Sequence, residues 1–150
     1  MATQLKDFAT AVIAVVEPET SILVVAQLMR KHHVGALVVV DAEEKNRALG
    51  IISDRDVVLG LIAEELDPKI FTAGDMMSNN LITASPEMEA MDAIRLMNEH
   101  KVRRLVVADK ENRLVGIVAM EDLLQLLASS LTDLASGLVG AREREMQQRI

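Results

Sequence analysis

Two short stretches of the chain carry residues suited to hold a small polar ligand. They read Gly50-Ile-Ile-Ser-Asp-Arg-Asp56 and Gly116-Ile-Val-Ala-Met-Glu-Asp122. A carboxylate can accept hydrogen bonds from the hydroxyls of a ribose, as an acidic residue does in other nucleotide-binding folds, and a nearby hydroxyl can add a directional bond. Both stretches keep the Asp, but the first has Ser53 where the second has Ala119. The first stretch is therefore the better candidate for a ribose site.

The side chains that could bind a phosphate lie mainly in the second half of the chain. Arg103 and Arg104 are adjacent there. The planar fork of a guanidinium group matches the oxygens of a phosphate, so Arg is the side chain best suited to bind one. Arg55, inside the first stretch, is a further cation. The strongest ribose and phosphate candidates thus lie in different halves of the chain.

An internal repeat relates the two halves. When the chain is shifted by 68 residues, residues 17–41 align with residues 85–109, and ten of the 25 positions are identical. After a loop that differs in length by two residues, the two stretches described above align at an offset of 66. Self-similarity at a fixed offset indicates that one structural unit occurs twice. We interpret the chain as a tandem duplication.

Each half is predicted to fold as a β-α-β-β-α unit of the α/β class. A short apolar strand comes first, and Pro18 or Pro86 then lies near a helix start, where a missing N–H has no partner to lose. Two β-branched runs separated by a polar loop predict a hairpin, and a second helix follows. The predicted ranges are strands 11–16, 36–40 and 48–53 with a helix from about Asp54, and strands 81–83, 105–108 and 114–119 with a helix from about Met120.

The same residues resemble a known domain family. LMRKHHVGALVVVD and LMNEHKVRRLVVAD, together with GIISDRD and GIVAMED, are similar to a tandem pair of CBS domains, which are named after cystathionine beta-synthase. Asp75-Met-Met-Ser78 is similar to the motif that opens a CBS unit, and Asp7 is its weaker counterpart. The expected domains are CBS unit 1 (7–66), a linker (67–74), CBS unit 2 (75–128) and a C-terminal helical extension (129–150).

The resemblance implies both a fold and a ligand site. It implies two units with their sheets packed face to face about a pseudo-twofold axis, and two clefts that often hold adenosine nucleotides or S-adenosylmethionine. In this family the ribose motif of one unit commonly faces the phosphate-binding positions of the other. One cleft is thus expected to combine Ser53 and Asp56 with Arg103 and Arg104, with Arg55 near the phosphates.

The resemblance also implies a second, weaker cleft. It would combine Asp122 and Ala119 with Gly35 and Ala36, which occupy the positions of the Arg pair in the first unit. This cleft would have neither a hydroxyl nor a cation. In the complete cleft, the adenine ring is expected to lie against Ile13 and Ala14 of the first strand.

Each of these features also has a simpler structural explanation. Ser53 and Asp56 suit a helix start, where a hydroxyl caps the backbone and acids complement the helix dipole. The Arg pair could be solvated or paired with Glu99, and exposed ion pairs contribute little. The joint occurrence of a hydroxyl, an acid and two Arg on matching sides of a duplicated fold favours a ligand site. The three histidines, His32, His33 and His100, lie at predicted helix ends, where a positive charge suits the helix dipole. We therefore predict no metal site.

Composition excludes several classes of function. The 150 residues include no cysteine, which rules out disulfides and Cys-ligated metals. The net charge of −7 argues against general binding to nucleic acid or anionic membranes, which needs clustered Lys and Arg. The chain shows no Ser-His-Asp set, phosphate-loop motif or suggestive carboxylate pair, so we predict that it is not an enzyme. The N-terminus makes a poor secretion signal, and we expect a soluble cytoplasmic protein without membrane contact.

The last predicted helix carries a long apolar seam. Its leucines are spaced by four, four, three and four residues, which places them along one side of a helix. Such a seam favours packing against a second copy or a partner protein, and packing back onto its own domain is the alternative. The seam consists of Leu123, Leu127, Leu131, Leu134 and Leu138.

We therefore predict a stand-alone CBS pair that forms a homodimer and binds AMP, ADP or ATP in the complete cleft. The ligand would shift the relative pose of the units and change a surface seen by an unidentified protein partner. S-adenosylmethionine is a less natural ligand, because its sulfonium cation suits the Arg pair poorly. The alternative function is an interaction module with empty clefts that docks through its C-terminal helix.

Overall fold

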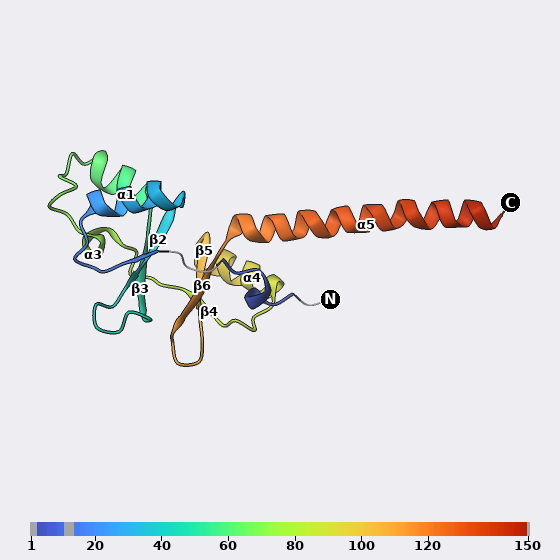
Figure 1. Ribbon diagram of the computed structural model, residues 1–150, viewed down its shortest axis with the longest axis horizontal. Helices are drawn as coiled ribbons and strands as arrows, with labels where there is room; N and C mark the ends of the chain where they lie inside the picture. Colours follow the sequence, from blue (N-terminus) through green and yellow to red (C-terminus); the bar gives the residue numbers. More distant parts are fainter. Residues whose placement is uncertain (1–2, 11–13, 150) are drawn as a thin grey trace.

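Two three-stranded mixed sheets form the centre of the molecule (Figure 1). The computed structural model of the chain describes residues 3–10 and 14–149. The first unit contains β1 (Val15–Val16), α1 (Ile22–His32), β2 (Ala36–Val40), β3 (Ala48–Ser53) and α2 (Asp54–Val57), which continues as a π-helical segment (Val58–Ile62). The second contains β4 (Thr83–Ala84), α4 (Ala90–His100), β5 (Arg104–Ala108), β6 (Leu114–Ala119) and α5 (Met120–Gln148).

Strand pairing is the same in both units, and the predicted β-α-β-β-α order is confirmed. β1 runs parallel to β2 and β2 antiparallel to β3, and the strands β4, β5 and β6 repeat this arrangement. The strands predicted at 36–40, 48–53 and 114–119 have the observed bounds. The strand predicted at 81–83 starts two residues and ends one residue before the observed β4, because only Thr83 and Ala84 pair with β5. Residues 11–13 of the predicted first strand lie outside the described residues.

The two sheets pack face to face, as predicted. Val38, Val40 and Val106 are buried between them, with Ile51 and Ile117 packed against this cluster. The alternate residues of β2 point to the opposite face, into a core shared with α1. A strand that is buried on both faces reads as a continuous apolar run, which explains the unbroken hydrophobic sequence of β2. The equivalent outer core of the second unit includes residues of α4.

The segments that precede the two units are exchanged between them. Leu5, in a 3-10 turn (Leu5–Asp7), is fully buried in the core of the second unit, and its N–H donates to the carbonyl of Met88 at 2.9 Å. Conversely, Ala73 in the short helix α3 (Ala73–Met76) is buried in the core of the first unit and donates to the carbonyl of Thr20 at 2.8 Å. Each unit is therefore completed by a segment that comes before the other in the sequence.

This exchange explains the two prolines, which lie near the helix starts but outside the helices themselves. α1 begins four residues after Pro18, and Ser21 caps it by accepting a bond from the N–H of Val24. The carbonyl of Pro18 instead accepts from Gly74 at 2.8 Å, and that of Pro86 accepts from Lys6 at 2.9 Å. The prolines therefore lie in the extended chain that receives the exchanged segments.

The helix α5 leaves the body of the molecule and extends to the C-terminal end (Figure 1). Its 29 residues correspond to about 43 Å of helix. Leu123 is its buried residue, and every side chain from Ala128 to Arg149 is exposed. The predicted alternative, in which the seam packs back onto its own domain, is therefore wrong for this part of the helix. By length and composition, α5 is the one described helix that could cross a membrane.

Candidate functional site

An open cavity of about 400 Å³ lies between the two units. The first unit contributes the end of β3 and the start of α2, and the second contributes the segment before β4, the start of β5 and the start of α5. The cavity brings together the five residues predicted for the ribose and phosphates: Ser53, Arg55, Asp56, Arg103 and Arg104. Its other lining residues are Ile51, Asp54, Ser78, Asn80, Leu81, Ile82, Lys101, Val102 and Glu121.

Ser53 and Asp56 form a reciprocal cap at the start of α2. Ser53 Oγ accepts a bond from the Asp56 N–H at 3.2 Å, and Asp56 Oδ2 accepts from both the N–H and the Oγ of Ser53 at 2.8 Å. The capping explanation is thus confirmed, and it is compatible with ligand binding. Within the described part of the chain no hydrogen bond reaches Asp56 Oδ1, so one carboxylate oxygen remains able to accept from a ligand.

The cationic wall of the cavity follows from how α4 ends. His100 is its last residue, and Lys101 then adopts a left-handed conformation with φ 57°, which turns the chain into β5. Lys101, Arg103 and Arg104 all line the cavity from this turn. Among the described residues, none of the three takes part in an ion pair within 4.0 Å, so the predicted pairing with Glu99 is not formed.

Arg104 reaches from the second unit to the first. A Cβ atom placed on Gly35 would lie 3.7 Å from Arg104 Nη2 and 3.2 Å from Asp54 Oδ2. The guanidinium group therefore ends beside the turn that precedes β2, close to the start of α2. Lys101, Arg55 and the Arg pair outnumber the acids Asp54, Asp56 and Glu121 in the lining, although the whole chain carries a net charge of −7. The cavity is thus a locally cationic site on an acidic protein.

The apolar part of the lining comes mostly from the second unit. Leu81 and Ile82 line the cavity just before β4, whereas Ala14 does not line it and packs against the core of the first unit. Ile13 lies outside the described residues. Leu81 and Ile82 are the repeat equivalents of Ile13 and Ala14. The apolar lining of this cavity thus comes from the matching positions of the second unit.

Parallel pairing of β4 with β5 provides a signal that could have identified these residues. Thr83 pairs with Val106, so the residues just before Thr83 lie beside the start of β5, where the Arg pair is. Lys101, Asn80 and Glu121 were also missed. Lys101 could have been found from its position in the sequence, because it continues the cationic segment that contains the Arg pair.

The residues predicted for a second cleft have local structural roles. Asp122 Oδ2 accepts a bond from the N–H of Ala119 at 2.8 Å, which reproduces half of the cap formed by Ser53 and Asp56. The carbonyl of Gly35 accepts from the N–H of Asp54 at 2.9 Å, and Ala36 pairs with Ser53 in the sheet. None of these predicted second-cleft residues lines the cavity described above. Gly35 approaches Arg104 of the first site instead.

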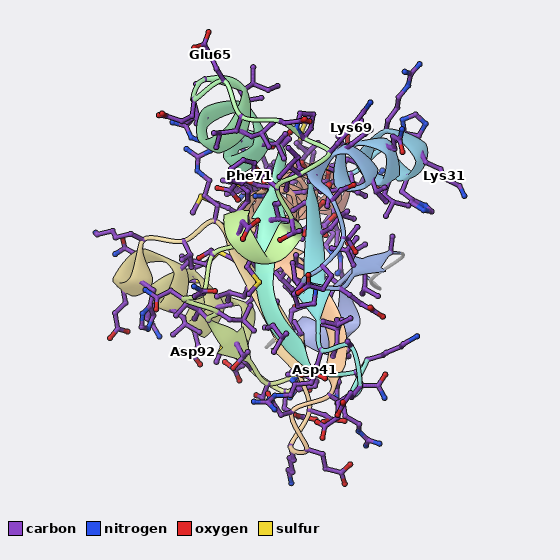
Figure 2. The ribbon with its side chains drawn as sticks, turned by 90° about the vertical axis from the view of Figure 1, so that its left-hand side faces the viewer. Lys31, Asp41, Glu65, Lys69, Phe71 and Asp92 are labelled. Carbon is purple, nitrogen blue, oxygen red and sulfur yellow. The ribbon has the colours of Figure 1, made fainter. Side chains whose placement is uncertain are left out.

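The two carboxyl groups whose pKa is shifted lie in the hairpin loops and do not line the cavity. Backbone N–H groups of Glu44 and Glu43 donate to Asp41 and lower its pKa. The pKa of Asp109, its repeat equivalent, is lowered chiefly by the backbone N–H of Arg113. Figure 2 shows Asp41 at the opposite end of the first unit from Lys31 of α1. We assign these two acids to loop structure.

Clusters of metal-ligating side chains were sought among the described residues. Those residues contain no group of three or more His, Cys, Asp or Glu side chains arranged to hold a metal ion. The chain has no cysteine.

Comparison with known proteins relates the chain to small CBS proteins. It is 39% identical over 121 residues to the CBS domain-containing protein YhcV of Bacillus subtilis, a match that covers 81% of this chain and 83% of YhcV. It is 37% identical over 109 residues to the uncharacterized protein MK0525 of Methanopyrus kandleri, of which it spans only 55%. The match to inosine-5'-monophosphate dehydrogenase of Methanocaldococcus jannaschii covers 21% of that enzyme.

Solved structures give the same relationship. Hypoxic Response Protein I, crystallised with two coordinated zinc ions, has a TM-score of 0.71 at 32% identity, over 82% of this chain and 98% of that one. PAE2072 from Pyrobaculum aerophilum, complexed with AMP, has a TM-score of 0.74 at 25% identity, over 85% and 99% of the two chains. CBSX2, also in complex with AMP, has a TM-score of 0.68 at 27% identity, over 84% and 96%.

The sequence profile of the CBS domain matches twice, over residues 5–62 and 73–129. Both matches begin at the exchanged segments, and together they cover most of the chain. The duplicated fold, the sequence relatives and the solved structures therefore agree that this chain belongs to the CBS domain family and contains a tandem CBS pair.

Proposed function

We propose that the chain is a regulatory module that binds an adenosine nucleotide in the cavity between its two units. The observation that supports this proposal most strongly is the composition of the cavity. A capped Asp with an available carboxylate oxygen lies in the same lining as three cations of the second unit that have no ion-pair partner among the described residues. Capping alone does not explain why these groups share one cavity.

Each part of the nucleotide has a matching part of the lining. Asp56 Oδ1 accepts from the ribose hydroxyls, while Ser53 keeps the carboxylate oriented through its bond to Oδ2. Arg103 and Arg104 bind the phosphates, because guanidinium groups form paired, charge-assisted hydrogen bonds with phosphate oxygens. The adenine ring lies against the apolar residues before β4, and Asn80 offers an amide to its edge.

Phosphorylated ligands fit this lining better than S-adenosylmethionine does. The ligand is AMP, ADP or ATP, because a phosphate is attracted to the cationic side chains of the second unit, whereas a sulfonium adds another positive charge beside them. The AMP present in the solved structures of PAE2072 and CBSX2 supports the same class of ligand for this chain. A bound phosphate draws Arg104 and the first unit together, so the relative pose of the units responds to the ligand.

Thermal unfolding tests this proposal. The chain contains no Trp or Tyr, so far-UV circular dichroism is a better probe than intrinsic fluorescence. A ligand at one hundred times its Kd stabilises the folded state by about 2.7 kcal/mol, which raises the Tm by several degrees. We expect AMP, ADP or ATP to raise the Tm of the wild type and of Arg95→Ala, whose exposed side chain pairs with Asp92, but not of Arg104→Ala. Absence of any shift with all three nucleotides would overturn the proposal.

A second candidate function is supported by α5. Its apolar seam is exposed in the single chain, as a docking element requires. In this alternative the clefts are empty and the protein acts by contact alone. Its stability is then indifferent to nucleotide, while charges introduced at Leu131 or Leu134 abolish its contacts.

A further inference from the structure

The exposed seam of α5 starts one residue later than the sequence suggested. Leu123 is only 2% exposed, since it belongs to the core of the second unit. The side chain of Leu124, by contrast, is 61% exposed, and those of Leu131 and Leu134 are 68% and 72% exposed. The residues available to another molecule are therefore those from Leu124 onward.

The spacing of these exposed residues is that of a coiled coil. They alternate by three and four residues, the heptad pattern that lets one helix pack along another. The opposite side of the helix carries the polar residues Ser129, Asp133, Ser136 and Glu143, and two exposed apolar residues, Val139 and Met146. A membrane-spanning helix is apolar all round, so the charged and hydroxyl side chains on this side favour a protein contact over a lipid one. The seam consists of Leu124, Leu127, Leu131, Leu134, Leu138 and Ala141.

The helix is poorly suited to stand alone. Gly137 and Gly140 lie in its exposed part, and a Cβ at either would meet no atom within 4 Å. Glycine weakens a helix, and in proteins most of the stability of a helix comes from packing its apolar face against another element. The residues beside the seam are small, with Ala128, Ala135 and Gly137 among them, so the surface admits the close approach of a second helix.

We propose that α5 pairs with α5 of a second copy of this chain, in antiparallel orientation. When Leu131 lies opposite Leu134 of the second copy, the whole seam is matched: Leu127 opposes Leu138, and Leu124 opposes Ala141. The overlap covers 18 residues of each helix, or about 27 Å.

Charge favours this orientation over the parallel one. Residues that flank a heptad seam meet their counterparts on the other helix and set its direction. In the antiparallel register, Glu121 of each copy approaches Arg142 of the other, which gives two attractive pairs. In a parallel register, Arg144 would face Arg149, and these like charges repel.

Sedimentation equilibrium on the full chain tests whether the seam joins two copies. We expect the wild type to be a dimer and the double variant Leu131→Asp, Leu134→Asp to be a monomer. The matched control, Ser129→Asp with Ser136→Asp, adds the same charges to the polar side and stays dimeric. Both double variants change residues outside the cores of the two units, so their far-UV spectra should still report folded domains. A monomeric wild type, or a dimer that survives Leu131→Asp, Leu134→Asp, overturns the proposal.

Disulfide cross-linking tests the orientation, and the absence of native cysteine makes single-Cys variants free of background. Leu124→Cys mixed with Ala141→Cys should cross-link in the antiparallel dimer. Leu124→Cys alone should not, since its two copies are about 25 Å apart. Self-cross-linking of Leu124→Cys contradicts the antiparallel arrangement.

Flotation with phosphatidylcholine vesicles tests whether the seam binds lipid instead. Vesicle binding by the wild type that is lost in Leu131→Asp, Leu134→Asp would assign the seam to a membrane and overturn the dimer. None of these measurements uses a nucleotide, so they stand or fall independently of the proposed ligand.

Discussion

Asp122 Oδ2 accepts a 2.8 Å hydrogen bond from the backbone N–H of Ala119, although Ala119 has no hydroxyl to return a bond. Asp56 makes the same bond to Ser53 in the first unit. The carboxylate is therefore required twice by the structure, because in each unit it satisfies the first free N–H of a helix. The hydroxyl completes the cap in one unit only, and its capping pair, Ser53 and Asp56, lines the cavity, whereas Ala119 and Asp122 do not.

Replacing Asp56 and Asp122 in turn should distinguish their effect on stability from their effect on nucleotide binding. We expect Asp56→Ala and Asp122→Ala each to lower the free energy of unfolding by about 1 kcal/mol, since each loses a helix cap. Only Asp56→Ala should abolish nucleotide binding, because Asp122 does not line the cavity. Urea unfolding and calorimetric titration measure the two effects. Loss of binding in Asp122→Ala with an intact fold would show that the second acid also serves the ligand.

Ala119→Ser should restore the missing half of the second cap. The new hydroxyl can accept from the N–H of Asp122 as Ser53 does from Asp56, so we expect a gain of about 0.5–1 kcal/mol in the free energy of unfolding. No further nucleotide should bind, since Gly35 and Ala36 supply no cation. An additional equivalent of bound nucleotide would refute this explanation of why the hydroxyl occurs once.

Gly116→Ala should destabilise the exchanged segments. A Cβ at Gly116 would lie 2.9 Å from the carbonyl oxygen of Thr10, a backbone atom that cannot move aside alone. Overpacking of this kind lowers the free energy of unfolding by about 1–3 kcal/mol. The control is Gly140→Ala, whose Cβ meets no atom within 4 Å. A Gly116→Ala variant with the wild-type Tm would contradict the close approach of Gly116 to the backbone of Thr10.

Lowering the pH should weaken the contribution of Asp109 to the stability of the fold. Its pKa lies below the ordinary 3.8, mainly because the N–H of Arg113 donates to it, so folding favours its charged form. Such a carboxylate stabilises the fold above its unfolded pKa, and this contribution is lost as pH falls through the lower folded pKa. We expect Asp109→Asn to lower the Tm at neutral pH, and its Tm to converge on that of the wild type below pH 3.8. A difference in Tm that is constant with pH would contradict this role.

The repeat made most of the fold and half of the site predictable. Strand pairs at 36–40 with 48–53 are local in sequence, and their β-branched runs leave little choice of structure. The meeting of Ser53 and Asp56 with Arg103 and Arg104 was predicted because the family resemblance supplied the relation between the units. No local sequence pattern in residues 36–53 indicates that the first unit faces Arg103 and Arg104 of the second.

Other features depended on long-range packing and were missed. The exchange of Leu5 and Ala73 between units joins residues far apart in sequence, and their local patterns resemble ordinary turns. Leu81 and Ile82 line the cavity because parallel pairing places them beside Arg104, a consequence of sheet topology. The burial of Leu123, which shifts the exposed seam of α5, depends on where this helix leaves the second unit.

Titration calorimetry with AMP, ADP, ATP and S-adenosylmethionine is the most direct test of nucleotide binding between the two units. We expect saturable binding of an adenosine phosphate near one equivalent per chain, lost in Arg104→Ala and retained in Arg95→Ala. Two equivalents per chain would contradict the assignment of a single working cleft. The absence of heat with all four ligands, supported by an unchanged Tm, would contradict nucleotide binding and leave the contact surface of α5 as the function to pursue.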